Sequence, residues 1–514
     1  MNSIDRKVFN VGKDLTSKTG SVSDLMQNIP SVTVDIDGVI SLRGSSSVML
    51  LINGKPSALM GANRAAVLQQ MPANSIERIE VITNPSAKYK PDGTSGIINI
   101  VLKKNKLLGF NGTVTANAGN ESRYNGNILA NYNPGKLNVF GSYSIRQDNR
   151  TRFTDDKRTR TDTTTHTRSY STLNVNDQSR PLSQIISTGA DYKINYKNTV
   201  GITGSFNYRD FTRHQINVNK SENSSFEITK DYDRINLGPQ VEKDLEFSAK
   251  MQHTFAKEGH ELNLDFVTSK SMEQEDNHFS NIYRVPVIPS TYDNTLIKQG
   301  DNESQLTLEY INPISETAKL EAGYIYEYQK NDMDFYGESL NQVLNIWEKD
   351  IIKTNRFIYS TNIHVFYATF QKEMGRFGFL SGLRAENAFV NANQVTTDTS
   401  LTNQYFRLYP SLLLSFKLND VNELQLNYSH RIRRPEGDEM NPLPEYQDTY
   451  NLRIGNPHLK PEEIHSVEMG YQYKNKNVTF LSTLYYRYAY NGMTSITRYM
   501  NDSVLVSTTE NISK

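Results

Sequence analysis

The chain has 514 residues, which is long for one ordinary soluble domain and favours at least two structural units. Lysine and arginine together number 56, and aspartate and glutamate together also number 56, so the formal net charge is zero. A balanced chain gives no reason to expect a nucleic-acid partner, which would require a basic patch, and we expect no such partner. The absence of cysteine excludes disulfides, thiolate metal sites and cysteine nucleophiles.

Apolar runs in the sequence are short, and none approaches the ~18 residues of a transmembrane helix. The most apolar runs, such as VMLLI at residues 48–52, have the length of a strand. The mean hydropathy is negative, which fits either a soluble protein or a transmembrane β-barrel with a polar interior. The 30 Tyr and 21 Phe beside a single Trp favour the barrel, because such rings form belts at membrane interfaces.

The first hundred residues predict a compact mixed α/β unit that ends near Lys104. Ser23 and Asp24 can cap a short helix that Pro30 ends, and residues 62–70 form a second helix-forming stretch. Short apolar runs bounded by turn residues predict the strands between and after these helices. These strands are expected at residues 32–34, 40–42, 48–52, 76–82 and 96–102.

From Leu108 onward the pattern changes to alternation of apolar and polar residues, as in residues 478–490, and helical patterns disappear. Each run has the roughly 9–11 residues that a tilted strand needs to cross a bilayer. We expect roughly fifteen strands joined by tight turns and by long polar loops, of which residues 150–181 and 274–295 are examples. One such run alone would favour a soluble β-sandwich, but the repetition favours a transmembrane barrel.

Four runs in the first unit resemble the plug signature of TonB-dependent outer-membrane receptors, and two later runs are similar to barrel segments of the Bacteroidetes-type outer-membrane β-barrel branch. Their occurrence in the family's order makes the resemblance specific, and it covers nearly the whole chain from about Asp14. The plug runs are SVTVDIDGVISLRG at 31–44, VMLLINGKP at 48–56, IERIEVITNPSAKY at 76–89 and GTSGIINIVLKK at 93–104. The barrel runs are YPS at 409–411 and NPHLKPE at 456–462.

The resemblance implies a mostly β protein, with a small α/β plug domain at residues 1–105 and a large antiparallel transmembrane β-barrel at residues 106–514. Barrels of the family are similar to closed sheets of 22 strands, more than this sequence supplies, and the family carries a signal sequence that is not visible here. We therefore expect a fragment with a C-terminally truncated barrel. The implied location is the outer membrane of a Gram-negative bacterium, with outer-membrane lipid around the barrel.

Several charged residues in these motifs are candidates for a cluster that joins plug to barrel. In the family, the positions of Arg43 and Arg78 resemble half of such a cluster, and Glu80 lies beside Arg78. On the barrel, Glu468 shares the polar face of its predicted strand and Glu386 lies on the face of Arg384. The alternative is that all of these are ordinary solvated strand charges.

The plug motifs also contain residues that suit sharp turns of the backbone. Asn53-Gly54 is a turn of the hairpin type, since both residues tolerate positive φ. The full set of expected turn residues is Gly44, Asn53, Gly54, Pro85, Gly93 and Gly96.

The sequence gives no pattern for catalysis, a cofactor or a metal site. It has no glycine-rich phosphate loop and no Gly-x-Ser-x-Gly elbow. His430, His458 and His465 lie near one another in sequence but lack the spacing of metal ligands, so we expect solvated or lumen-facing histidines. We therefore expect a protein that is not an enzyme.

Two functions follow from the resemblance. The first is energy-coupled import of a large scarce ligand, such as an iron chelate, a cobalamin-like compound or a glycan, in which a TonB-type inner-membrane energy complex moves the plug. The glycan-importing branch is disfavoured, because residues 84–96 lack its usual form. The second function is a plugged-barrel surface receptor or scaffold that binds without import.

Overall fold

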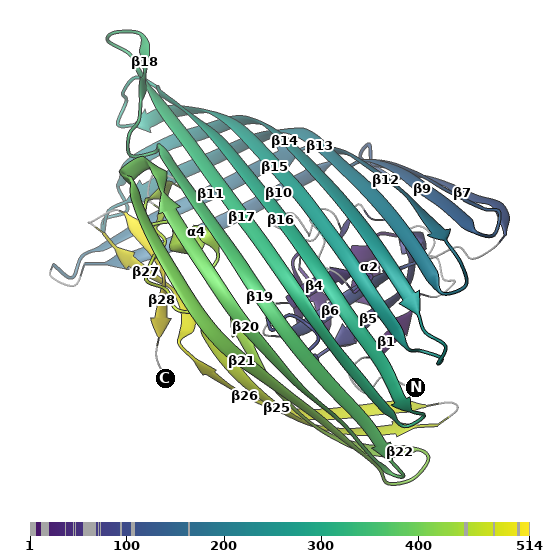
Figure 1. Ribbon diagram of the computed structural model, residues 1–514. Coiled ribbons are helices and arrows are strands. Elements are labelled where there is room, and N and C mark those ends of the chain that lie inside the picture. Colours follow the sequence, from purple (N-terminus) through teal and green to yellow (C-terminus); the bar gives the residue numbers. More distant parts are fainter. Residues whose placement is uncertain are drawn as a thin grey trace.

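The computed structural model contains a small α/β unit followed by a large curved β-sheet that surrounds it (Figure 1). The structure describes residues 7–11, 20–35, 38–44, 46, 48–54, 68–69, 71, 73–92, 95–103, 108–162, 165–446, 451–475, 478–500 and 504–512. Among these residues, no helix has the length and apolar character to cross a membrane.

The plug contains a four-stranded sheet in the order β1-β5-β6-β4 and a separate pair, β2-β3. The central strand β6 reads GIINIVL, and a nearly continuous apolar run of this kind suits a strand covered on both faces. Its neighbours are antiparallel β5 and parallel β4. The bounds are β1 (Lys7–Asn10), β2 (Val32–Val34), β3 (Ile40–Leu42), β4 (Val48–Ile52), β5 (Ile76–Ile82) and β6 (Gly96–Leu102), with a 3-10 turn at Ala73–Ser75. The predicted plug strands are confirmed.

Helix α2 (Val22–Gln27) has its N-cap two residues earlier than the predicted cap at Ser23. Its N-cap is Ser21, whose side-chain oxygen accepts from the backbone N–H of Asp24 at 3.2 Å, while the Asp24 carboxylate accepts from the backbone N–H of Ser21 at 2.7 Å. The prediction that Ser23 caps this helix is therefore wrong. Ser21 is the N-cap, and Ser23 lies within the helix with its side chain buried. The second predicted helix, residues 62–70, lies outside the described residues except for residues 68 and 69.

The turn after β4 has the expected backbone but not the expected role. Asn53 and Gly54 have φ angles of 52° and 80°, as a hairpin turn would require. However, β4 pairs in parallel with β6, so this turn does not join an antiparallel hairpin. Instead, Gly54 N donates to Asn99 Oδ1 at 2.7 Å and Leu102 N donates to Asn53 Oδ1 at 3.0 Å, which fastens the turn to β6.

Among the described residues, the large sheet has 18 antiparallel strands. β10 and β11 form a hairpin beside β13, and the short β18 pairs with β17. The other strands follow one another from β7 to β26, and the barrel that they form is not closed among the described residues. The first strands are β7 (Gly109–Ala118), β8 (Tyr124–Asn133), β9 (Leu137–Gln147), β10 (Arg150–Thr161), β11 (Arg168–Ser179), β12 (Leu182–Lys193), β13 (Asn198–Glu222), β14 (Ile228–Thr254) and β15 (Glu261–Val285). The later strands are β16 (Thr291–Ser315), β17 (Ala318–Asn341), β18 (Ile346–Lys349), β19 (Asn355–Met374), β20 (Phe377–Gln394), β21 (Thr399–Lys417), β22 (Asn422–Arg433), β25 (Glu462–Lys474) and β26 (Thr479–Tyr490), with a 3-10 turn at Val395–Thr397.

Side chains alternate across this wall as the sequence pattern predicts. On β25, Ser466 and Glu468 are buried toward the plug, whereas Val467 and Met469 are exposed on the outer face. This is the arrangement of a barrel strand, with apolar residues facing hydrocarbon and polar residues facing the interior. The mostly β fold, with an α/β plug before an antiparallel barrel sheet, is therefore confirmed.

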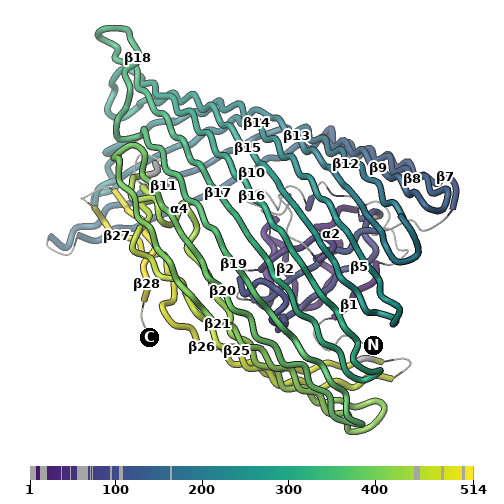
Figure 2. The backbone as a smooth tube through the Cα atoms, in the orientation of Figure 1, coloured from purple at the N-terminus to yellow at the C-terminus, as the bar shows by residue number. Residues whose placement is uncertain are grey.

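The two segments predicted as long polar loops are strands. Residues 150–181 contain the β10-β11 hairpin, and residues 274–295 contain parts of the long strands β15 and β16, which extend past the rest of the wall (Figure 2). The loop prediction was wrong because it relied on apolar alternation. A hairpin with both faces in water needs only backbone pairing, so its side chains carry no such signal.

A second, smaller sheet lies at the same side of the molecule as these extensions (Figure 1). Its order is β23-β24-β28-β27, with β24 and β28 parallel. It is accompanied by a one-turn helix, α4. The bounds are α4 (Gly437–Met440), β23 (Glu445–Tyr446), β24 (Asn451–Arg453), β27 (Gly492–Tyr499) and β28 (Leu505–Ile512). We call this sheet the mouth sheet.

Candidate functional site

The plug touches the wall chiefly through the connection between β5 and β6. We call residues 84–92, of sequence NPSAKYKPD, the docking segment. Its first half, residues 84–87, is buried. Its second half brings Lys88, Lys90 and Asp92 to the barrel wall.

Hydrogen bonds fix the docking segment against β21 and β22. The backbone N–H of Ala87 donates to Ser411 Oγ at 3.1 Å, and the Ser429 hydroxyl donates to Asn84 Oδ1 at 3.1 Å. The contact is close at Gly382 on β20, where an added Cβ would lie 2.7 Å from the Ala87 Cβ. Only glycine therefore allows the plug backbone to approach the wall so closely at this point.

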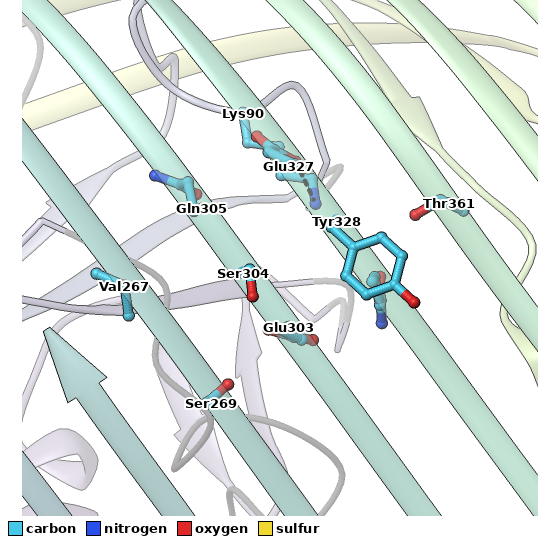
Figure 3. Close-up of a pocket in the computed structure, with 10 residues that line it drawn as sticks. Lys90, Val267, Ser269, Glu303, Ser304, Gln305, Glu327, Tyr328 and Thr361 are labelled. Atoms are coloured by element: carbon cyan, nitrogen blue, oxygen red, sulfur yellow. Dashed lines mark ion pairs between the residues drawn. The ribbon is translucent and has the colours of Figure 1, made fainter.

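Two lysines of the docking segment pair with carboxylates on one side of the wall. Lys88 pairs with Glu309 on β16, and Lys90 Nζ lies 3.0 Å from Glu327 Oε2 on β17. Figure 3 shows Lys90 reaching from the plug toward Glu327 at the edge of a cavity of about 60 Å³. Glu303 of β16 also lines this cavity, so the wall here is acidic.

The last residue of the docking segment, Asp92, is an anion and pairs with an arginine just after the end of β22. Asp92 lies 2.6 Å from the guanidinium of Arg434, which also pairs with the buried Glu386 on β20. Glu386 in turn lies 2.6 Å from Arg384 Nε. Arg431 donates to the backbone carbonyl of Asp92. The plug thus presents cations to carboxylates and an anion to arginines.

A second connection lies apart from the docking segment and involves two of the residues singled out in the sequence. Arg43 pairs with Glu468 on β25, and the Thr83 hydroxyl lies 3.4 Å from Glu468 Oε2. The Arg43 guanidinium also lies 5.2 Å from the ring centroid of Tyr485. Glu468 is only 2% exposed, so this pair is shielded from water.

The structure does not bring Arg78 to the barrel wall. Its described ion pairs are with Glu80 at 2.9 Å and Glu77 at 2.7 Å, both within β5. Glu80 is buried and accepts from Asn99 Nδ2 at 2.9 Å, which ties β5 to β6. Arg78 and Glu80 thus belong to an ion network of the plug itself, and the cluster that includes Glu386 is joined to the plug through Asp92.

Four of the predicted turn residues adopt positive φ. Gly44, Asn53 and Gly54 have φ angles of 78°, 52° and 80°. Gly96 has φ of 127°, and a Cβ there would lie 2.6 Å from the carbonyl oxygen of Ile82, so a side chain is excluded on two grounds. Pro85 is buried at the start of the docking segment, and Gly93 lies outside the described residues.

The three histidines singled out in the sequence, His430, His458 and His465, occur in two places. His430 and His465 stack with ring centroids 4.4 Å apart, and His430 Nε2 lies 3.1 Å from Glu463 Oε2. His458 lies in the turn before β25. In the described part of the chain, no group of three or more His, Asp or Glu side chains has the geometry to hold a metal ion.

The charged residues of the docking segment and most of their partners were not among the residues predicted from the sequence. The missed residues are Lys88, Lys90, Asp92, Glu309, Glu327, Arg431 and Arg434. One signal was present, because three charges follow one another at alternate positions between two apolar strands. A charged connection between buried strands needs partners nearby.

The ion pairs of the docking segment are expected to be stable across the physiological pH range. Burial opposes charge on Lys90, but Glu327 and Asp92 outweigh it and raise the pKa of Lys90; Lys88 behaves likewise beside Glu309. Burial also opposes charge on Asp92, but Arg434 outweighs it and lowers the pKa of Asp92. These directions predict that proton binding near neutral pH does not break the ion pairs of the docking segment.

The pH dependence of docking follows from the signs of these shifts. The raised lysine pKa values stabilise docking below their ordinary value, and this contribution is lost only as pH rises through the raised values. The lowered Asp92 pKa stabilises docking above its ordinary value, and this is lost as pH falls through the lowered value. Proteolysis of the plug is expected to be constant between about pH 5 and pH 9 and to increase below about pH 3. Undocking between pH 6 and pH 8 would contradict this assignment.

Comparison with known proteins agrees with this architecture. Residues 7–97 match the family model of the TonB-dependent receptor plug domain. Residues 253–514, about half of the chain, match the model of the outer membrane protein beta-barrel family.

Solved structures share the fold at low sequence identity. The copper transporter OprC superposes with a TM-score of 0.68 at 14% identity, over 100% of this chain and 75% of that chain. The ferric enterobactin receptor of Pseudomonas aeruginosa gives 0.63 at 14% identity, over 100% and 76%. The ferric yersiniabactin uptake receptor FyuA of Yersinia pestis gives 0.58 at 12% identity, over 96% and 73%.

The plug, the polar contacts that join it to the wall, and the alternation of the barrel strands are thus found together with matches to both family models. The chain belongs to the outer membrane protein β-barrel family, carries a TonB-dependent receptor plug domain, and is an outer-membrane protein of a Gram-negative bacterium.

Proposed function

We propose that this protein imports a scarce ligand into the periplasm by energy-coupled movement of its plug, which ends near residue 105 where the barrel begins. The observation that carries this proposal is the contrast between the plug's interior and its contacts with the wall. The two hydrophobic clusters of the plug contain plug residues alone. The docking segment, by contrast, meets the wall through ion pairs and hydrogen bonds.

This contrast suits a plug that must move without unfolding. Displacing the plug would leave its apolar cores intact and would rehydrate the charged groups of the docking segment. Because desolvation offsets much of the attraction in a buried ion pair, exchanging such pairs for water costs far less than exposing an apolar core. The arrangement therefore favours a stopper that a pulling force can release and that closes again afterwards.

The plug domain implies a TonB-type inner-membrane energy complex as the partner that supplies this force. For the ligand, we favour a metal chelate over a cobalamin-like compound or a glycan. The solved structures of similar fold carry names that refer to copper, ferric enterobactin and ferric yersiniabactin. The family normally consists of transporters without enzymatic activity, and we assign no reaction to this chain.

A reversible tether between plug and wall tests import directly. The chain has no cysteine, so Ala87→Cys with Ser411→Cys introduces a unique pair where Ala87 N and Ser411 Oγ are 3.1 Å apart. Cells that express the protein would be grown with limiting iron, cobalamin or glycan. The oxidised pair is expected to abolish the growth benefit of expression, and reduction is expected to restore it.

The same growth assay also tests the control variant and the alternative function, a receptor that binds without import. Ala87→Cys alone should behave as the unmodified protein in both redox states. If oxidation of the pair leaves the growth benefit unchanged, plug movement is not required for import and the proposal fails. If expression gives no benefit in any condition while cells still bind ligand, the receptor that binds without import replaces it.

A further inference from the structure

Two neighbouring turns at one end of the barrel wall bring three lysines together. The turn at residues 134–136 joins β8 to β9 and ends with Lys136, and the turn at residues 194–197 joins β12 to β13 and ends with Lys197. The backbone N–H of Lys193, the last residue of β12, donates to the Lys136 carbonyl oxygen at 2.8 Å, which holds the two turns side by side. Both turns lie at the end of the wall opposite to the mouth sheet (Figure 1). We call Lys136, Lys193 and Lys197 the lysine corner.

The lysine corner carries positive charge that no carboxylate balances. The nearby carboxylate on β12, Asp191, already pairs with Lys250 at 2.7 Å. In the part of the chain that the structure describes, the three lysines form no ion pair, and Lys197 Nζ lies 5.4 Å from the ring centroid of Tyr196. The next turn, at residues 255–260, contains one lysine and one glutamate and so adds no net charge. The excess charge of the corner is therefore available to a partner outside the chain.

The position of the corner relative to the apolar outer face indicates what that partner is. Leu137 of β9 pairs with Tyr192 of β12, and both side chains are exposed on the outer face of the wall. Lys136 and Lys193 follow directly after this pair toward the turns, and Ile194 beside them is also exposed. Apolar residues on this face contact hydrocarbon, and exposed Tyr rings lie at the membrane interface. The lysine corner therefore lies at the level of the lipid headgroups.

The topology of the wall assigns the corner to one leaflet. Short turns of an outer-membrane barrel face the periplasm, and long extensions face the cell exterior. The turns at residues 134–136 and 194–197 are short, whereas the extensions of β13 and β14 lie at the other end of the wall. A lysine at this boundary can lay its apolar stem along its neighbours and place its ammonium group among phosphates. The corner thus suits the headgroups of the periplasmic leaflet.

We propose that the lysine corner binds the headgroup of an anionic phospholipid in the periplasmic leaflet, with the lysines on its phosphate and with Tyr192 and Ile194 beside its acyl chains. This interaction goes beyond the proposed import function and does not depend on it. It would hold one sector of the wall, β8 to β13, to anionic lipid whether or not the plug moves.

Binding of fluorescently labelled phosphatidylglycerol to the purified full chain in an uncharged detergent tests the proposal, with labelled phosphatidylcholine as the lipid without net charge. Phosphatidylglycerol should bind at least about tenfold more tightly, because ~1 kcal/mol of attraction per lysine corresponds to about fivefold in affinity. This preference should shrink as salt rises from about 0.1 M to about 1 M, since the screening length falls from about 10 Å to about 3 Å.

Substitutions in the corner should reduce this preference step by step. Each of Lys136→Gln, Lys193→Gln and Lys197→Gln should weaken phosphatidylglycerol binding about fivefold and leave phosphatidylcholine binding unchanged. Ile194→Asn removes an apolar contact without changing charge, so it should weaken the binding of both lipids equally.

The matched control is Lys349→Gln on β18, an exposed lysine on the extension at the other end of the wall. It should bind both lipids as the unmodified protein does. Equal binding of the two lipids, or equal weakening by Lys349→Gln, overturns the proposal. Competition by inorganic phosphate at about 1 mM would show a site for the free ion and would overturn it as well. Circular dichroism checks folding, and if a glutamine variant is not folded, Lys→Arg at the same position, which keeps the charge, should retain the preference; its loss in a folded arginine variant would contradict the assignment.

Discussion

Arg434→Gln is expected to undock the plug and to lower the free energy of unfolding by ~3–5 kcal/mol, the usual effect of breaking a buried charge pair. Arg434 is 10% exposed and pairs with both Asp92 of the plug and Glu386 of β20, which is 1% exposed. Without the guanidinium, two carboxylates from plug and wall face each other in a poorly hydrated site. Their repulsion adds to the loss of the attraction that each carboxylate had to Arg434, and the neighbouring Arg384 and Lys90 offset only part of that loss.

Two measurements would detect this change. The midpoint of thermal or denaturant unfolding should fall, and the outer membrane of cells that express the variant should become permeable to dyes that the plug normally excludes. Asp92→Asn in the Arg434→Gln background should recover part of the lost stability, because it removes one of the two carboxylates that repel each other.

Arg407→Gln is the matched control for this experiment. Arg407 lies on β21, is 45% exposed and pairs with Glu463 at 3.0 Å on the outer side. An exposed pair of this kind is worth about 0–1 kcal/mol, so little change is expected in stability and none in permeability. Equal effects of the two substitutions would show that Arg434 has no special role in docking.

The sequence predicts much of the fold because the two units follow different periods. The apolar runs of β4 and β6 and the alternation of β25 each report how many faces of a strand are buried. The same signal fails at β10 and β11, since a hairpin with both faces in water has no apolar side. The extended backbone of such a hairpin is stabilised only by hydrogen bonds to the neighbouring strand. The side chains of one strand do not show which strand it pairs with.

The contacts between plug and wall were harder to predict. Lys90 is near Asp92 in sequence, but their partners lie hundreds of residues away, Glu327 on β17 and Arg434 just after the end of β22. Which barrel residue faces a given plug residue depends on how the plug sits in the lumen, and the register of a single strand does not contain that information.

The two plug arginines show the same limit. Arg43 and Arg78 both lie in motif runs, yet their surroundings differ. Arg43 has a φ of 54° at the turn after β3, which projects it from the sheet to Glu468. Arg78 lies within β5 and pairs with neighbours on its own strand. The backbone conformation, rather than the residue type, thus decides which arginine reaches the wall.

Arg43→Gln is accordingly expected to destabilise plug docking by ~3 kcal/mol, because it leaves Glu468 buried without its cationic partner. Arg78→Gln changes the same charge on the same unit but should cost docking only about 1 kcal/mol or less, since Arg78 is 33% exposed and both of its partners, Glu77 and Glu80, belong to β5. The buried Glu80 keeps its hydrogen bond from Asn99 Nδ2. Glu468→Gln combined with Arg43→Gln should cost less than the sum of the single substitutions, with a coupling of ~1–3 kcal/mol. Protection of the plug from proteolysis, measured for the unmodified protein, the three single variants Arg43→Gln, Arg78→Gln and Glu468→Gln, and the double variant, gives the comparison. Additive effects, or an Arg78→Gln variant as labile as Arg43→Gln, would place the connection between plug and wall elsewhere, in the docking segment or in the hydrogen bonds of Gln69 with Arg146 and Arg150.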